Sequence, residues 1–449
     1  MNKIINKTIC FLFAGLALLN LKSNSQNQTL FEKKANEYVR PFAETKNFNG
    51  AILVAQKGKI LYNKAFGMAN QDFDILNKPD TKFHIASVSK NFTAAAILLL
   101  EQRNLLKVTD TISKYVSDLP YGNKITIHQL LTHTSGIPNI NNMPEYDTVV
   151  PFPQTPESLI NVFKNKPLDF TPGTKYSYSN SNYNILAYII QKVSHMNYGD
   201  FLAENIFKPL AMQNTGHHKN AGMTIKNSSV GYQADGNFGL EKSSYLDWTS
   251  KTGNGSLYST IEDLYKWDRA LYTEKILSKN SIEKMYVNYG GFAGYGCFVK
   301  EQFNKKWYYM NGRSPGFTSY FARYPDDDVC IIVLANNYVP VVTQIGTNIA
   351  AILFGEKYEI PQLNAAKVDE KIIKEVIGQY QFDDKFYRPN FIMTVSQKDG
   401  HLITDWEELI PKADFNYIGR TYWSEINFVK DKNGVISAMT YDSFKAKKL

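Results

Sequence analysis

Alternation of hydrophobic and polar residues divides the chain into two strand-forming regions with a helical region between them. Near the N-terminus, "GAILVAQKGKILYNKAFG" contains two β-rich runs around a Lys57-Gly58-Lys59 turn, which predicts a hairpin. From Tyr295 onward a period of two returns in "YGCFVK", "KWYYMN", "FTSYFARYP" and "VCIIVLAN", which predicts an antiparallel meander. Residues 105 to about 290 are mainly helical in pattern, with long Pro/Gly/Asn-rich loops. We therefore expect an α/β (α+β) domain whose antiparallel sheet joins both ends of the domain, flanked by helices, with a helical subdomain.

Three segments have helical periodicity next to these strands. "TLFEKKANEYVRPFAE" places apolar residues at helical intervals, and "VVTQIGTNIAAILFG" is expected to form a helix after the last strand of the meander. "SVSKNFTAAAILLLEQRN", which starts at Ser87, is apolar on nearly every side in its middle. A helix of that kind belongs in the interior of a domain.

The last eighty residues have a different pattern. "EKYEIPQLNAAKVDEK" is polar and contains proline, as linkers do. After it, "IGQYQF", "FIMTVSQ", "HLITDW", "EINFVK" and "VISAMTY" are short strand-like runs separated by turn residues. We expect a leader at 1–25, a main domain at 26–360 and a small all-β domain at 372–449.

The first residues, "MNKIINKTICFLFAGLALLNLKSNSQ", have the features of a secretory signal. Lys3 and Lys7 precede an apolar run that is too short to span a bilayer, and the small residues Ser23-Asn24-Ser25 follow it. The protein is therefore expected to be exported, to a periplasm or out of the cell. The alternative is an uncleaved membrane anchor. No later segment is long and apolar enough to cross a membrane, so no transmembrane segment is expected after cleavage.

Charge and cysteine content exclude some partners. Removal of Lys3, Lys7 and Lys22 with the signal lowers the net charge from +8 to +5, and this surplus is dispersed, which argues against nucleic acid. Cys297 and Cys330 lie in separate strand-like runs and are expected to be buried thiols. No Cys/His cluster has metal-ligand spacing, and no metal or cofactor is expected.

Gly312-Arg313-Ser314-Pro315-Gly316 fits the G-x-S-x-G pattern of a nucleophile elbow. An elbow has a strand before the serine, a helix after it, and a backbone N–H on the next residue. Here the next residue is Pro315, which has no N–H, and the following "FTSYFARYP" alternates like a strand. We therefore interpret Ser314 as a turn residue between two strands.

Ser-x-x-Lys occurs twice, and its context separates the two copies. Ser281–Lys284 lies in the amphipathic "SKNSIEKMY" and is expected at the surface. Ser87–Lys90 begins the most buried helical segment. Residues i and i+3 share a helix face, so the Lys90 amine can reach the Ser87 hydroxyl, and burial lowers the pKa of a lysine. The alternative is a Ser87 that caps the helix and a Lys90 whose ammonium extends to solvent.

Tyr178-Ser179-Asn180 follows in "FTPGTKYSYSNSNYNILAYIIQKVS". A tyrosine near a lysine loses its proton more easily and can act as a general base, and the Asn180 amide can orient a substrate. The alternative is an aromatic loop before an amphipathic helix. A second Tyr-x-Asn at Tyr286–Asn288 shows that the tripeptide alone is not specific.

A family resemblance joins these motifs. "FHIASVSKNFTAAAILLLEQ", "TIHQLLTHTSGIP", "FTPGTKYSYSNSNYNILAYIIQKVS", "IFKPLAMQNTG", "GNGSLYSTIEDLYKW" and "RSPGFTSYFARYPDDDVCIIVLAN" occur in this order. Together they resemble the serine hydrolases related to class C β-lactamases, D-Ala-D-Ala carboxypeptidases and their esterase relatives. The resemblance covers roughly residues 30 to 355. The residues after 370 resemble the small lipocalin-like β domain of some members.

The resemblance implies roles for particular residues. Ser87 would be the acylated nucleophile, Lys90 its proton partner, Tyr178 the base that later protonates the leaving group, and Asn180 a substrate-orienting residue. The backbone N–H groups of Ser87 and Arg313 would form the oxyanion hole, whose donors contribute about 3 to 4 kcal/mol each. His133, in "LLTHTSGIP", would have a structural role.

One position departs from the family pattern. The Lys- or His-x-Gly triplet of the family corresponds to Met310-Asn311-Gly312, so the cation is replaced by a thioether that donates no hydrogen bond. We therefore expect weaker preference for carboxylate-bearing substrates, with neutral esters or amides relatively favoured; Arg313 is an alternative source of charge. The predicted function is hydrolysis of a small-molecule or peptide substrate through an acyl-enzyme. The alternative is a catalytically weakened binding or sensing protein.

Overall fold

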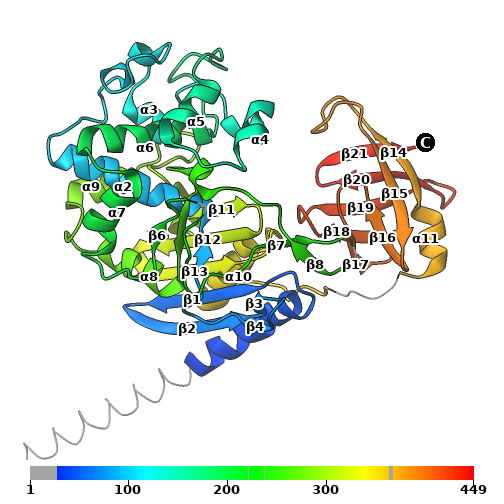
Figure 1. Cartoon of the computed structure of the whole chain (residues 1–449). Coiled ribbons are helices and arrows are strands. Elements are labelled where there is room, and N and C mark those ends of the chain that lie inside the picture. Colours follow the sequence, from blue (N-terminus) through cyan, green and yellow to red (C-terminus); the bar gives the residue numbers. More distant parts are fainter. Residues whose placement is uncertain (1–27, 221, 237, 364–367) are drawn as a thin grey trace, which may run out of the picture.

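The structure, a computed structural model, describes residues 28–220, 222–236, 238–363 and 368–449. The predicted signal and Cys10 lie outside the described residues. A six-stranded antiparallel sheet with helices on both faces forms the larger part of the protein, and a second, eight-stranded sheet lies beside it (Figure 1). No helix in the described ranges is long and apolar enough to span a membrane.

The main sheet confirms the prediction that both ends of the domain contribute to one sheet. Its spatial order is β10-β11-β12-β13-β1-β2. The first strand, β1, pairs with the last, β13, from Gly50 opposite Ala335 to Gln56 opposite Val329. The strands are β1 (Gly50–Gln56), β2 (Lys59–Phe66), β10 (Phe298–Gln302), β11 (Lys305–Ser314), β12 (Phe317–Tyr324) and β13 (Val329–Ala335).

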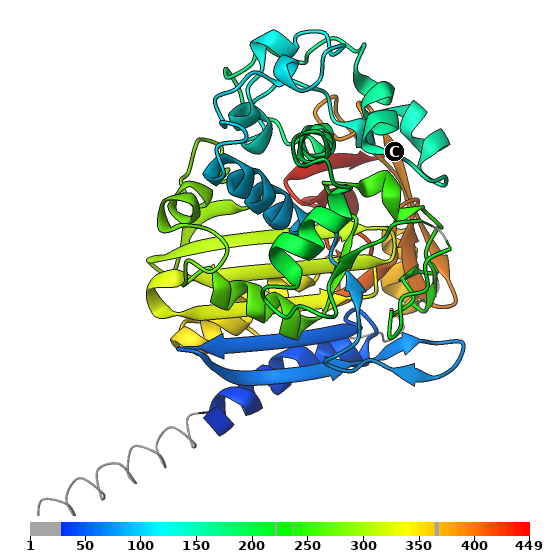
Figure 2. The ribbon, with the colours of Figure 1, turned by 60° about the vertical axis from the view of Figure 1, so that its left-hand side comes forward.

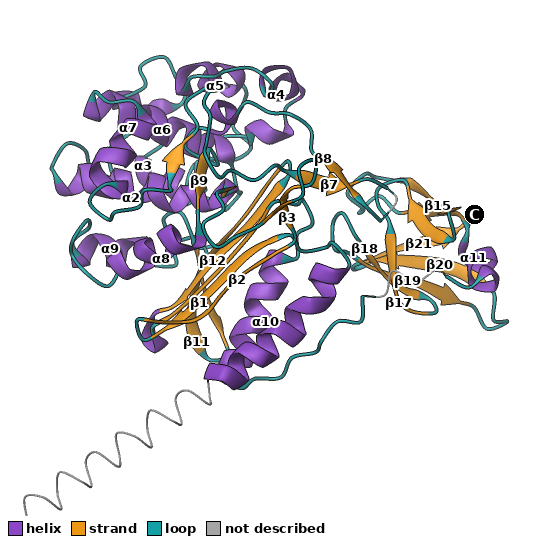
Figure 3. Cartoon of the chain, turned by 60° about the horizontal axis from the view of Figure 1, so that its bottom comes forward, coloured by secondary structure: helices purple, strands orange, loops and turns teal. Residues whose placement is uncertain are grey.

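Each face of this sheet is covered by helices. The N-terminal helix (28–44) and α10 (Val342–Phe354) cover one face, as Figure 3 shows. The other face packs against the helical subdomain. β13 is buried at every residue because it lies between these two layers, which explains its continuous apolar run "VCIIVLA". Cys330 in β13 and Cys297 are buried free thiols, as predicted.

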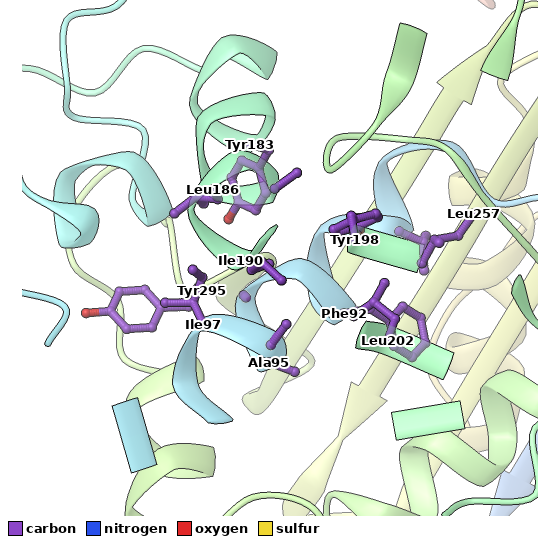
Figure 4. Packing of buried hydrophobic residues seen from close by; sticks show 14 of the residues in the cluster. Phe92, Ala95, Ile97, Tyr183, Leu186, Ile190, Tyr198, Leu202, Leu257 and Tyr295 are labelled. Atoms are coloured by element: carbon purple, nitrogen blue, oxygen red, sulfur yellow. The ribbon is translucent and has the colours of Figure 1, made fainter. Parts of the chain in front are cut away.

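Helix α2 (Ser89–Gln102) passes through the centre of the larger core. Every residue from Ser89 to Leu100 is buried, in agreement with the apolar character of the segment on all sides. Figure 4 shows this core, with Tyr183, Leu186 and Ile190 of α6 (Asn180–Ser194) on one side of α2 and Leu202 beside Phe92. The α-helix begins two residues later than the sequence pattern indicated, because Ala86–Val88 form a 3₁₀ turn.

The helical subdomain lies between β2 and β10 in sequence and above the main sheet in Figure 2. It also contains short strands that the sequence pattern did not reveal, among them β5 (Phe83–His84), β6 (Gly216–His217) and β9 (Leu257–Ser259) in one small sheet. A hairpin of β7 (Tyr232–Ala234) and β8 (Leu240–Lys242) extends toward the C-terminal sheet (Figure 1). The remaining helices are α3 (Ile127–Leu131), α4 (Pro144–Val149), α5 (Pro156–Phe163), α7 (Tyr198–Leu202), α8 (Ile261–Ala270) and α9 (Lys279–Met285).

The C-terminal region forms its own antiparallel sheet around a separate apolar core. Its two edge strands are joined by a bridge between Ile403 and Glu408, so the sheet is nearly closed. The strands are β14 (Gly378–Phe382), β15 (Ile392–Lys398), β16 (His401–Thr404), β17 (Leu409–Ala413), β18 (Asn416–Gly419), β19 (Glu425–Lys430), β20 (Ile436–Tyr441) and β21 (Phe444–Lys448). Five were predicted; β17, β18 and β21 are short or rich in polar residues and were not. Helix α11 (Glu370–Val376) begins within the segment interpreted as a linker.

Candidate active site

Ser87 occupies the 3₁₀ turn between β5 and α2 and is partly exposed. The turn is anchored to two sheets, because the Ser319 hydroxyl of β12 donates to the Ile85 carbonyl at 2.7 Å and the Ile85 N–H donates to the Leu257 carbonyl at 2.9 Å. Ala86 has φ +43°, a left-handed conformation that costs on the order of 1–3 kcal/mol for a residue with a Cβ. The surrounding structure holds this strained residue in place and presents Ser87 to the solvent side.

The Lys90 side chain is fully buried one turn further along. Its Nζ lies 3.1 Å from Ser87 Oγ, 2.8 Å from Asn180 Oδ1 and 2.7 Å from the Asn254 carbonyl oxygen. Burial, with a smaller contribution from the positive charge of Lys251, holds the pKa of Lys90 well below its usual value of 10.5. Lys90 therefore faces Ser87 and does not extend to solvent.

Tyr178, just before α6, is the third side chain that meets Ser87 and Lys90. Its Oη lies 2.9 Å from Ser87 Oγ, and Lys90 Nζ lies 5.1 Å from the centre of its ring. The ring stacks on His133 at 4.4 Å between centroids, while His133 Nδ1 accepts the Ser179 N–H at 3.1 Å. Burial and the nearby Lys90 lower the pKa of His133 to about 3, so this imidazole is neutral. His133 thus holds the Tyr178 ring and the Ser179 backbone in place.

The pKa of Tyr178 changes in the direction opposite to the sequence-based argument. That argument expected the neighbouring lysine to favour loss of the tyrosine proton. Burial instead raises the pKa of Tyr178 above its usual value of 10.0, and the hydrogen bond with Ser87 offsets this only in part. Burial also shifts Lys90 toward its uncharged amine, which weakens the stabilisation that it can give to a tyrosinate. Tyr178 is therefore a phenol at neutral pH.

Two asparagines hold the Lys90 amine. Asn180, the first residue of α6, accepts from Lys90 through Oδ1 and donates through Nδ2 to Asn141 Oδ1 at 2.9 Å. Asn254 contributes only its backbone carbonyl, and its own N–H donates to the Lys251 carbonyl. Sequence reasoning did not single out Asn254, because any residue type can offer a carbonyl. The only signal in the sequence is that Asn254 lies in "GNGSLYST", one of the segments that carry the family resemblance.

Strand β11 runs past Ser87. A Cβ added to Gly312 would lie 2.7 Å from the Ser87 backbone N and 2.4 Å from Ser319 Oγ, so only glycine allows this approach. Met310, two residues earlier, is 3% exposed and packs in the same core as α2. Met310 and Gly312 therefore point to the site's face of the sheet.

Arg313 lies on the same strand, but its side chain points away from the site. Its guanidinium donates to the Thr421 carbonyl in the C-terminal region at 2.7 Å and lies over the ring of Tyr338 at 3.8 Å. Only the backbone of Arg313 is near the Ser87 turn, next to Gly312. The alternative that the Arg313 guanidinium replaces the missing cation is wrong, because successive side chains of a strand point to opposite faces.

Ser314 lies where the sequence placed it, but Ser281 is 5% exposed, so the prediction that it lies at the surface is wrong. Ser314 is the buried last residue of β11, and the strand β12 follows it after a two-residue turn. Ser281 Oγ donates to Gln102 Oε1 at 3.0 Å, and Lys284 forms an ion pair with Glu101 at 2.8 Å. The second Ser-x-x-Lys pair therefore joins two packed helices, and this packing buries Ser281 and leaves Lys284 partly exposed.

A model of the family described as Beta-lactamase matches residues 35–354, which include Ser87, Lys90, Tyr178 and β11. This chain belongs to the beta-lactamase family. Its members are serine hydrolases, so the predicted family resemblance and the general class of enzyme are confirmed.

Relatives and solved structures agree with this assignment. "Penicillin-binding protein 4*" of Bacillus subtilis is 28% identical, with 94% of this chain and 98% of that protein covered. "Putative penicillin-binding protein PbpX" of the same organism is 34% identical over 61% of this chain and 67% of that protein. The octameric penicillin-binding protein homologue from Pyrococcus abyssi has a TM-score of 0.65 at 26% identity, with 93% of this chain and 99% of that chain covered. The structural likeness to the Pyrococcus abyssi protein therefore includes both the main sheet and the C-terminal sheet of this beta-lactamase family member.

Proposed function

We propose that this protein is an exported serine hydrolase that cleaves an ester or amide through an acyl-enzyme on Ser87. The observation that carries the proposal is the convergence of Lys90 Nζ and Tyr178 Oη on Ser87 Oγ, at 3.1 and 2.9 Å. A partly exposed serine hydroxyl contacted by an amine of lowered pKa has the arrangement of an activated nucleophile.

The hydrogen bonds around Lys90 suggest which group removes the serine proton. The Asn180 Oδ1 and Asn254 carbonyl oxygens can only accept, so they take the two N–H groups of a neutral amine. The amine's lone pair is then left for the Ser87 hydroxyl. Lys90 takes the proton as Ser87 Oγ bonds to the substrate carbonyl carbon, and the phenol of Tyr178 donates toward the leaving group as its bond to that carbon breaks. A water molecule then attacks the acyl carbon and gives its proton to the Tyr178 phenolate, and the Lys90 ammonium returns its proton to Ser87 Oγ as the acyl bond breaks.

The negative charge on the substrate oxygen requires donors near Ser87. We place the carbonyl oxygen between the backbone N–H groups of Ser87 and Arg313, since Gly312 brings β11 into contact with the Ser87 turn. Strand β10 pairs with β11 from Phe298 opposite Tyr309 to Gln302 opposite Lys305, so residues 310–314 of β11 border the site without a β10 partner. A substrate backbone can lie along that edge, where Asn180 would orient it.

A cavity of about 410 Å³ at the far end of β11 fits the acyl part of an uncharged substrate. Its lining includes Pro315, Phe317, Trp248, Leu246 and His84, and also Lys242, whose charge is paired with Asp72. Burial keeps the pKa of His84 well below 6.5, so that imidazole is neutral. One residue, Ser314 at the end of β11, separates Arg313 from Pro315 of the cavity lining. The proposed substrates are therefore small esters or amides with an apolar acyl group.

Covalent labelling tests the proposed reaction. A fluorophosphonate is expected to label the parent protein at Ser87, identified by mass spectrometry of the labelled peptide, and a fluorescent penicillin is expected to label the same residue and then be released. Labelling without release supports the alternative of a catalytically weakened binding or sensing protein, which the Met310 substitution motivates. Absence of labelling at Ser87 contradicts both.

Met310 accounts for the expected substrate preference. In Met310→His, an imidazole at this buried position adds a hydrogen-bond donor next to the site. The rate on a chromogenic β-lactam, relative to the rate on a short p-nitrophenyl ester, should therefore increase by about tenfold. This factor is the equivalent of one hydrogen bond to a charged group. The measurement is kcat/KM for both substrates in parent and variant. Met310→Leu, which conserves size without a donor, is the matched control. An unchanged ratio in Met310→His shows that Met310 does not set the preference.

A further inference from the structure

Strand β11 is held from both sides at the point where it passes Ser87. On one side Gly312 contacts the Ser87 turn. On the other side the next residue, Arg313, reaches the loop between β18 and β19 of the C-terminal sheet, residues 420–424, which we name the docking loop. The backbone between these two contacts includes the Arg313 N–H.

The Arg313 guanidinium has contacts that fix its position. Nη2 donates to the Thr421 carbonyl at 2.7 Å, the ring of Tyr338 lies 3.8 Å from the guanidinium carbon, and the ring of Tyr422 lies 5.3 Å away. Tyr338 belongs to the main domain, since its N–H donates to the Tyr232 carbonyl at 2.9 Å. The Arg313 guanidinium therefore lies between the Tyr338 ring of the main domain and the docking loop.

The docking loop is itself rigidly attached to the main domain. Arg420 is 1% exposed, and its guanidinium donates to Asn47 Oδ1 at 2.8 Å, to the Gly239 carbonyl at 2.9 Å and to Glu408 Oε2 at 2.7 Å. Trp423 donates through Nε1 to Gln344 Oε1 of α10 and packs against Phe42 at 5.8 Å. Arg420 Nη2 has no hydrogen-bond partner, but the Arg420–Glu408 ion pair is buried, so displacement of the loop would leave a buried charge unpaired.

We propose that the C-terminal sheet positions the oxyanion hole, with Arg313 as the positioning residue that connects the docking loop to the reacting edge of β11. The inference rests on the proposed function. Displacement of a transition-state donor by about 1 Å reduces the rate by roughly 10²-fold, while ground-state binding of the substrate changes much less. The C-terminal sheet is therefore part of the catalytic scaffold without contacting the substrate.

Arg313→Met in the full-length protein tests this role. It keeps an apolar side chain against Tyr338 and removes the bond to Thr421. We expect kcat for a p-nitrophenyl ester to fall at least tenfold with KM changed less than threefold, and Arg313→Lys, which can still donate to the carbonyl, to recover part of kcat. Lys305→Met is the matched control: Lys305 lies on the same strand, ion-paired to Asp327 at 2.7 Å and 4.7 Å from the Phe354 ring. This control should retain the parent kcat.

A double-mutant cycle separates positioning from general destabilisation. Trp423→Phe removes the bond to Gln344 and loosens the docking loop, so its effect on kcat should overlap with that of Arg313→Met, and the double variant should be less impaired than the product of the single effects. Equal kcat in Arg313→Met and Lys305→Met, or multiplicative effects in the cycle, overturns the inference about Arg313. Ser87-dependent hydrolysis in the parent protein would still support the proposed function in that case. A parent without fluorophosphonate labelling at Ser87 overturns both.

Discussion

Ser87→Ala is expected to lower kcat for ester hydrolysis by at least about 10⁴-fold, because the acyl-enzyme cannot form without the hydroxyl. Ser87 Oγ is the atom on which Lys90 and Tyr178 converge. Removing it leaves only the backbone donors and substrate positioning to accelerate the reaction. The measurement is hydrolysis of a short-chain p-nitrophenyl ester, with fluorophosphonate labelling of the same samples.

The chain itself offers the matched control for this variant. Ser281 begins the second Ser-x-x-Lys pair and contacts Gln102 on a neighbouring helix. Ser281→Ala should therefore keep the parent rate and the parent labelling. A Ser87→Ala protein that folds normally and retains more than a few per cent of the parent activity would show that the nucleophile is another residue.

Lys90→Met is expected to reduce kcat/KM by about 10²- to 10⁴-fold, the usual contribution of a positioned general base. The variant replaces the amine with a thioether of similar length, so Ser87 keeps Tyr178 as a partner but has no group that accepts its proton. Lys284→Met is the matched control, since Lys284 pairs with Glu101 and should not affect the rate. Equal losses in both variants contradict the role of Lys90.

The pH profile distinguishes a base from a structural lysine. Lys90 acts as a base only when uncharged, so kcat/KM of the parent should rise with pH and level off well below 10.5, because burial and Lys251 lower the pKa of Lys90. The other titratable groups around the amine are Tyr178, Tyr183 and His133, all neutral at neutral pH. Lys251→Met removes a nearby positive charge, raises the pKa of Lys90 and should move the rising limb to higher pH. A limb that does not move contradicts this electrostatic account.

Much of the site could be predicted because its residues share local geometry. Ser87 and Lys90 are three residues apart in a helical segment, and that spacing brings their side chains to one face whatever surrounds them. The choice between the two Ser-x-x-Lys pairs also followed from local pattern, since only one lies in a segment that is apolar on all sides. The same local argument rejected Ser314, because Pro315 has no N–H to donate.

Other features depended on neighbours that are distant in sequence. The phenol of Tyr178 was expected to lose its proton readily beside a lysine, but the fold buries both groups, and burial favours the neutral form of each. The side-chain direction of Arg313 was open because the register of β11 decides it. The carbonyl of Asn254, 164 residues from Lys90, has no side-chain signature.

The sequence by itself determined the strands of the main sheet, which helix is buried, and which serine and lysine are paired, because these depend on periodicity and on short spacings. Only the tertiary structure decided the charge states of Lys90 and Tyr178, the carbonyl that holds the amine, and the contact between Arg313 and the C-terminal sheet. These depend on burial and on contacts between segments far apart in the chain. Desolvation and packing act through three-dimensional neighbours, and a linear pattern does not specify them.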